Sequence, residues 1–77
     1  MKVVVYSTNS CPYCVMVKEW LDEQGIEFIE KNVQEDPAVA EEMVEKSGQM
    51  GVPVTDIDGQ TVIGFNVAKL KKLLNVD

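Results

Sequence analysis

The chain has 77 residues, and seven lysines against thirteen carboxylates give it a net charge of −6 at neutral pH. This length accommodates one domain, residues 1–77, and the acidic charge excludes a nucleic-acid partner, because phosphates are bound by basic surfaces. No apolar run approaches the roughly 18 residues of a membrane helix, and the apolar start is too short for a signal-peptide core, so we expect a cytoplasmic protein without a membrane partner.

The first third of the chain predicts a strand followed by a helix. Residues Lys2–Tyr6 form a β-branched run that ends in polar residues, which is typical of a strand that enters a loop. Pro12 suits the first turn of a helix, and Gly25 can end that helix in a left-handed conformation. Helical spacing gives this helix one apolar face. The residues that share this face are Cys14, Val17 and Leu21.

The middle of the chain predicts a second strand and a second helix. Residues Ile26–Val33 alternate apolar and charged side chains with one exception, which indicates a half-buried strand. Asp36 and Pro37 are typical of a helix start and Gly48 of a helix end, so we expect a helix over residues 37–47. Its glutamates are expected to form a solvated face. These glutamates are Glu41, Glu42 and Glu45.

The last third predicts a hairpin and a final helix. Residues 52–57 and 60–63 are expected to form two short strands, and Asp58-Gly59 between them fits the positive φ angles of a tight turn. Asn66 can cap a helix whose lysines lie toward its C-terminal end, where the helix dipole favours cations. Because a strand–helix–strand crossover makes its two strands parallel, we expect an α/β fold of order βαβαββα, with a four-stranded mixed sheet and helices on both faces.

Cys11 and Cys14 stand where the first strand passes into the first helix. Unpaired backbone N–H groups and the positive end of the helix dipole stabilise a thiolate there, so Cys11 is expected to be the catalytic nucleophile that attacks disulfides. Cys14 lies one turn further on, close enough to attack the mixed disulfide formed at Cys11. Its inward position keeps it protonated until then. The spacing therefore predicts an attacking and a resolving thiol.

Other roles for the two cysteines are open. A closed zinc site needs four ligands, and a chain with two cysteines and no histidine would need a second chain or carboxylates to supply them, so no metal ligand is assigned. A structural disulfide between residues 11 and 14 would close too short a loop to restrict the unfolded chain much. The competing function is a metal or iron–sulfur cluster carrier that acts as a dimer.

The chain resembles the glutaredoxins, within the thioredoxin-fold superfamily, over nearly its whole length. Residues 11–14 read Cys-Pro-Tyr-Cys, the active-site tetrapeptide of dithiol glutaredoxins, and residues 51–54 stand where the family has its Thr-Val-Pro segment. Ile63-Gly64 opens the family's glycine-containing turn. The resemblance implies a thioredoxin-like glutaredoxin fold and a cis peptide before Pro53. It also implies a thiol–disulfide oxidoreductase that reduces protein disulfides or glutathione mixed disulfides by dithiol exchange.

Seven residues are candidates for binding the substrate. By the resemblance, the backbone of Val52 pairs with the peptide of the bound thiol. Tyr13 lies between the two thiols and can form a wall of the substrate groove, although packing at the helix start is the alternative. For Phe65 the alternative is a place in the core under the last helix. The candidates are Pro12, Tyr13, Val52, Pro53, Gly64, Phe65 and Asn66.

The segments that would select the reductant depart from the glutathione-using members of the family. Those members have a basic residue three positions before the first cysteine, where this chain has Thr8, and two acids where it has Val67-Ala68. Gly64-Phe65 instead resembles the glutaredoxin-like redoxins that reduce ribonucleotide reductase and are reduced by thioredoxin reductase. Those redoxins rarely carry Pro-Tyr between the cysteines. The electron donor is therefore left open between glutathione and thioredoxin reductase.

The resemblance also bears on cofactors and partners. We expect a monomer without a tightly bound cofactor, for which glutathione is a candidate co-substrate. The expected partners are disulfide-containing proteins, with ribonucleotide reductase as one candidate, and either glutathione or thioredoxin reductase as the reductant.

Overall fold

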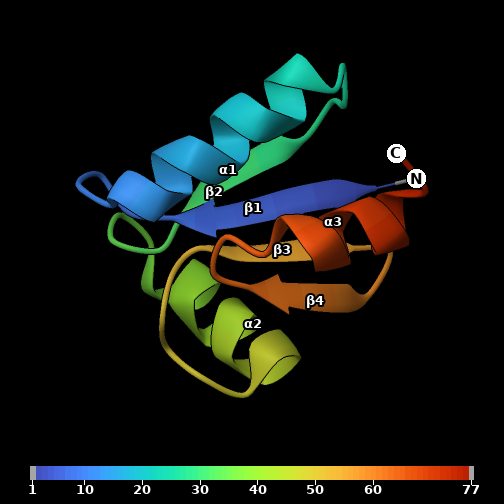
Figure 1. Cartoon of the computed structure of the whole chain (residues 1–77). Coiled ribbons are helices and arrows are strands. Elements are labelled where there is room, and N and C mark those ends of the chain that lie inside the picture. Colours follow the sequence, from blue (N-terminus) through green and yellow to red (C-terminus); the bar gives the residue numbers. More distant parts are fainter. Residues whose placement is uncertain (1, 77) are drawn as a thin grey trace.

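Within residues 2–76, which the computed structural model describes, four strands and three helices follow the predicted order βαβαββα (Figure 1). None of these helices is long and apolar enough to cross a membrane. The strands are β1 (Val3–Ser7), β2 (Ile29–Asn32), β3 (Val54–Ile57) and β4 (Gln60–Ile63). The helices are α1 (Pro12–Glu23), α2 (Pro37–Ser47) and α3 (Val67–Leu74).

The strands form one mixed sheet in the order β2-β1-β3-β4. β1 and β2 are parallel, as the crossover through α1 predicts, with Val4 opposite Ile29. β3 runs antiparallel to β1, and β4 runs antiparallel to β3. The turn between β3 and β4 has positive φ at both Asp58 (50°) and Gly59 (92°), which is the tight hairpin that the sequence indicates.

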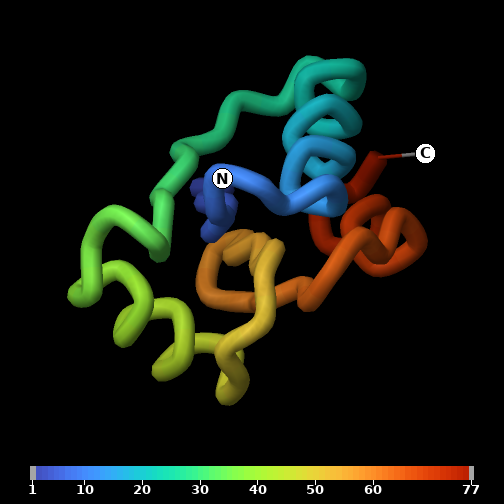
Figure 2. Tube along the Cα trace, turned by 90° about the vertical axis from the view of Figure 1, so that its left-hand side faces the viewer, coloured from blue at the N-terminus to red at the C-terminus, as the bar shows by residue number. Residues whose placement is uncertain are grey.

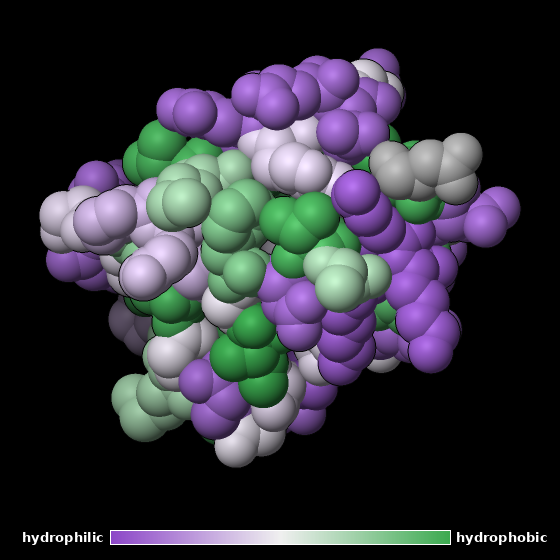
Figure 3. Space-filling model, in the orientation of Figure 1, coloured by the Kyte–Doolittle hydropathy of each residue, from purple (hydrophilic) through white to green (hydrophobic). Residues whose placement is uncertain are grey.

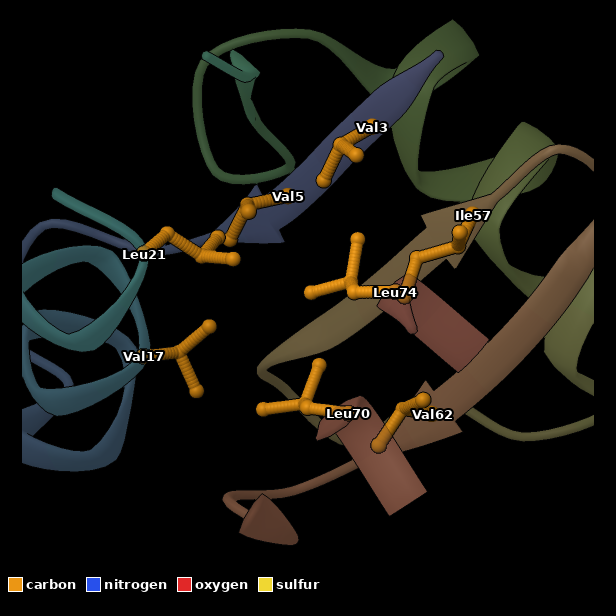
Figure 4. Packing of buried hydrophobic residues seen from close by; sticks show 8 residues of the cluster. All are labelled: Val3, Val5, Val17, Leu21, Ile57, Val62, Leu70 and Leu74. Atoms are coloured by element: carbon orange, nitrogen blue, oxygen red, sulfur yellow. The ribbon is translucent and has the colours of Figure 1, made fainter. Parts of the chain in front are cut away.

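The helices cover both faces of the sheet. Figure 2 shows α1 and α3 on one side of the strands and α2 on the other. The sheet has one hydrophobic core on each face, because successive side chains of β1 point to opposite faces. Val3 and Val5 belong to the core under α1 and α3, here called the α1/α3 cluster, whereas Val4 and Tyr6 belong to the core under α2. In Figure 4 the side chains of the α1/α3 cluster point toward one another from both helices and from three strands.

The second strand is shorter than the sequence indicates. The alternation over residues 26–33 predicts a strand of that length, but β2 spans only Ile29–Asn32, opposite Val4–Ser7 of β1. Ile26 and Phe28 instead pack against the α1/α3 cluster from an irregular segment before the strand. The alternation of apolar side chains therefore indicates that the segment packs on a core. It does not indicate how many residues pair with a neighbouring strand through backbone hydrogen bonds.

Thr55 of β3 has a buried hydroxyl without a hydrogen-bond partner among the described residues. A hydroxyl buried in this way costs about 1–3 kcal/mol, because it loses its bonds to water. We expect Thr55→Val to raise the free energy of unfolding by about 1 kcal/mol, measured by urea denaturation. Thr61→Val on β4, where the side chain is only half-buried, is the matched control and should have a smaller effect. A less stable Thr55→Val protein would contradict this assignment.

Candidate active site

The two cysteines lie at the N-terminal end of α1, directly after the loop that leaves β1. Cys11 is the N-cap residue with an extended backbone, and Pro12 is the first helical residue, as the sequence predicts. Both cysteines are free thiols; Cys11 is partly exposed, whereas Cys14 is completely buried. This end of the sheet lies at the left of Figure 1 and faces the viewer in Figure 2.

The Cys11 sulfur has two polar neighbours. It accepts a hydrogen bond from the backbone N–H of Cys14, with 3.2 Å between nitrogen and sulfur. This N–H belongs to the first turn of α1, where backbone donors have no carbonyl partner within the helix. On its other side the sulfur lies 4.0 Å from the carbonyl oxygen of Val52, toward which the thiol donates. Of the two cysteine sulfurs, this partly exposed one is the one that a substrate can reach.

Burial determines the chemistry of Cys14. Burial, together with the weaker effect of the neighbouring Cys11, raises the pKa of the Cys14 thiol to about 11. Lys18, one turn further along α1, acts in the opposite direction without offsetting the effect of burial. Its ammonium group is held by the Glu30 carboxylate at 2.5 Å. Cys14 is therefore a neutral thiol at neutral pH, as its inward position on the helix predicts.

Two loops that are distant in sequence meet beside Cys11. The Val52–Pro53 peptide is cis, as the resemblance implies, and it leads into β3. The Pro53 carbonyl accepts a hydrogen bond from the Gly64 N–H at 2.9 Å, which joins this loop to the one before α3. Gly64 has a φ of 75°, a conformation that few other residues adopt. The fold thus brings Val52, Pro53 and Gly64 to the active-site end of the sheet.

The other candidate residues have different surroundings. Tyr13 is 60% exposed on the first turn of α1, as a wall of a substrate groove requires. Phe65 is half-buried and packs against the α1/α3 cluster, so it serves the core and offers only part of its ring to the surface. Asn66 caps α3, as predicted, because its side-chain oxygen accepts the Lys69 N–H at 3.1 Å. Pro12 is exposed beside the cysteines.

The sequence did not identify Met16 as part of this surface. Its side chain is 43% exposed and borders a shallow groove between α1 and the loop before α3, together with Trp20 and Phe65. Met16 follows Tyr13 by three positions, so helical spacing alone would have placed both on one outward face. In the described part of the chain, no group of three or more metal-ligating side chains is placed to hold a metal ion.

Comparisons with known proteins show which proteins this chain is similar to in sequence. The glutaredoxin family model matches residues 3–62. An uncharacterized glutaredoxin-like 8.6 kDa protein in the rubredoxin operon of Clostridium pasteurianum is 44% identical over 72 residues, which cover 94% of this chain and 96% of the relative. The glutaredoxin-like protein NrdH of Lactococcus lactis subsp. cremoris is 42% identical over 71 residues, which cover 92% and 97%.

A solved structure is similar over almost the whole chain. A mutant of the thioredoxin-like protein BC3987 superposes with a TM-score of 0.93 and 36% sequence identity, and the match covers 99% of this chain and 97% of that one. The likeness extends over the sheet and the three helices, so the thioredoxin-like glutaredoxin fold implied by the sequence is confirmed.

Proposed function

Because the chain belongs to the glutaredoxin family, we propose that it is a thiol–disulfide oxidoreductase that reduces disulfides through Cys11 and Cys14. One observation carries the proposal: the partly exposed Cys11 sulfur accepts the N–H of Cys14, whose own sulfur is buried and protonated. The test is reduction of a protein disulfide by the purified chain with dithiothreitol as reductant. The chain should accelerate the reaction, and the chain lacking the Cys11 thiol should not.

The reaction proceeds by two exchanges. The Cys11 thiolate attacks one sulfur of the substrate disulfide, forms a mixed disulfide and releases the other sulfur as a thiolate. Cys14 then gives up its proton to the departing thiolate and attacks the Cys11 sulfur, which expels the second substrate sulfur as a thiolate that takes a proton from the solvent and leaves a Cys11–Cys14 disulfide. The substrate gains two electrons and two protons. During these steps the Val52 backbone, beside the Cys11 sulfur, pairs with the peptide of the bound substrate.

For the electron donor we propose thioredoxin reductase in preference to glutathione. Glutathione is an anion at neutral pH, and the chain is itself at −6 with Thr8 where a cation is expected. Lys18, a lysine close to the active site, is already held by Glu30. The NrdH relative from Lactococcus and the thioredoxin-like structural neighbour support the same choice. The proposed substrates are disulfide-containing proteins, with ribonucleotide reductase as a candidate, and the proposed active form is a monomer.

The donor is tested by measuring turnover side by side with glutathione plus glutathione reductase and with thioredoxin reductase. We expect the glutathione-driven rate to be lower by several-fold to about tenfold or more, because an exposed charge contact is worth up to about 1 kcal/mol and one or two are missing. Thr8→Lys combined with Val67→Asp should raise the glutathione-driven rate. Gln24→Lys, at the far end of α1, is the control for added charge. A glutathione-driven rate in the unmodified chain that equals or exceeds the other would exclude this donor assignment.

A further inference from the structure

None of the three lysines of α3 has an acidic partner among the described residues, whereas three of the four lysines elsewhere in the chain do. Three lysines each hold a carboxylate, at 2.5, 2.9 and 2.8 Å respectively: Lys18, Lys31 and Lys46. In contrast, none of Lys69, Lys71 and Lys72 forms an ion pair with a residue in the described range 2–76. The helix dipole explains cations in the last turn of α3, which holds Lys71 and Lys72, but it does not explain Lys69.

Two of these lysines line a groove between α3 and β4. The groove has apolar side chains, two side-chain amides and two ammonium groups, and no carboxylate lines it. In Figure 3 hydrophilic side chains cover the region of α3 next to a strip of apolar ones. The residues that line the groove are Gln60, Asn66, Ala68, Lys69, Lys72 and Leu73. Its chemistry suits a peptide segment that carries carboxylates.

One end of the groove is connected to the active-site end of the sheet through the backbone. Asn66 at this end follows the loop in which the Gly64 N–H donates to the Pro53 carbonyl. Pro53 is in turn joined to Val52, whose carbonyl oxygen lies 4.0 Å from the Cys11 sulfur. From there α3 runs away from the active site, as Figure 1 shows, for eight residues or about 12 Å. A substrate segment held at Val52 can therefore continue into the groove.

We propose that this groove receives an acidic segment that flanks the reactive cysteine of a protein substrate. Lys69 and Lys72 are three positions apart on a helix, so their Cβ atoms are about 5–6 Å apart. In an extended segment, side chains two positions apart are separated by about 6.6 Å on one face, which matches this spacing. Because the chain as a whole is at −6, it repels an acidic segment from its other surfaces and so favours this one. The proposal rests on the proposed function and names its substrate class.

The test uses two synthetic peptides with the same internal disulfide, flanked by Glu-Ser-Glu-Ser-Glu in one and by Gln-Ser-Gln-Ser-Gln in the other. The reduced chain should reduce the acidic peptide with about three- to tenfold higher kcat/KM, and added salt should diminish the difference. The variant Lys69→Gln/Lys72→Gln should lose this preference. Lys71→Gln removes one lysine charge of α3 at a position outside the groove and should retain the preference. Each variant is checked for helix content by circular dichroism.

A second measurement does not depend on activity. A version of the acidic peptide with serine in place of its cysteines should shift the backbone amide resonances of α3, and the Gln peptide should not. Equal kcat/KM for the two peptides, or equal loss of preference in Lys71→Gln, would overturn the docking proposal. All rates are compared with those for bis(2-hydroxyethyl) disulfide, which is uncharged. Failure to reduce this small disulfide would overturn the proposed function itself, whereas its reduction without a peptide preference would overturn the groove alone.

Discussion

The Cys11→Ser variant is expected to lose exchange with every disulfide substrate, down to the uncatalysed rate. Cys11 is the cysteine whose sulfur is both partly exposed and hydrogen-bonded to an N–H at the start of α1. A serine hydroxyl is not ionised at neutral pH and cannot form a mixed disulfide, so the first exchange cannot occur. The measurement is turnover on a protein disulfide and on a glutathionylated peptide.

The Cys14→Ser variant should separate the two substrates. On a protein disulfide it should lose activity, because nothing in the chain then resolves the mixed disulfide at Cys11. On a glutathionylated peptide it should retain activity, because added glutathione can attack the mixed disulfide in place of Cys14. Equal loss of activity in the two variants on the glutathionylated peptide would contradict the division of roles between attacking and resolving thiols.

Local signals in the sequence predicted the helix starts and the hairpin. Asp36 caps α2 by accepting the Ala38 N–H, and Asn66 caps α3 in the same way, because a cap depends on a few consecutive residues. The turn at Asp58-Gly59 was predicted for the same reason. The length of β2 was not, since the extent of a strand depends on a partner that is remote in sequence.

Contacts between elements that are far apart in the sequence could not be predicted from the sequence pattern. The helical pattern predicts a solvated face that includes Glu42, and the side chain of Glu42 is 37% exposed, but the pattern does not indicate which groups its carboxylate binds. In the structure its carboxylate accepts hydrogen bonds from the Tyr6 hydroxyl and the Lys31 ammonium. These two hydrogen bonds, of which the one from Tyr6 has the larger effect, hold the pKa of Glu42 below its usual range. They connect α2 with β1 and β2, and no spacing within α2 could indicate partners on those strands.

In the active site, too, local features were predictable from the sequence and contacts between distant segments were not. The spacing of Cys11 and Cys14 and their place before a helix predicted which thiol is accessible and which is buried, because both features are local. The approach of Val52 to the Cys11 sulfur joins residues 41 positions apart, and it was anticipated only through the resemblance to a family. The unpaired lysines of α3 were expected to serve the helix dipole. Their lack of carboxylate partners within the described residues emerged only from the folded chain.

At pH 6, iodoacetamide is expected to modify Cys11 at least about a hundredfold faster than Cys14. Only the thiolate reacts, and a thiol with a pKa of about 11 is ionised in about one molecule in 100,000 at this pH. Burial of the Cys14 side chain further excludes the reagent. The two rates are read from the masses of the labelled peptides after short exposures.

The pH dependence of Cys14 labelling and a control in urea test whether burial in the folded chain causes its slow reaction. Because burial raises the pKa of Cys14, its thiolate fraction increases about tenfold per pH unit up to about pH 11, so its labelling should speed up throughout that range. In concentrated urea both cysteines lose the environment of α1 and should react at similar rates. Similar rates in the folded chain at pH 6 would contradict the geometry, because they would require the buried Cys14 sulfur to be as accessible to the reagent as the Cys11 sulfur.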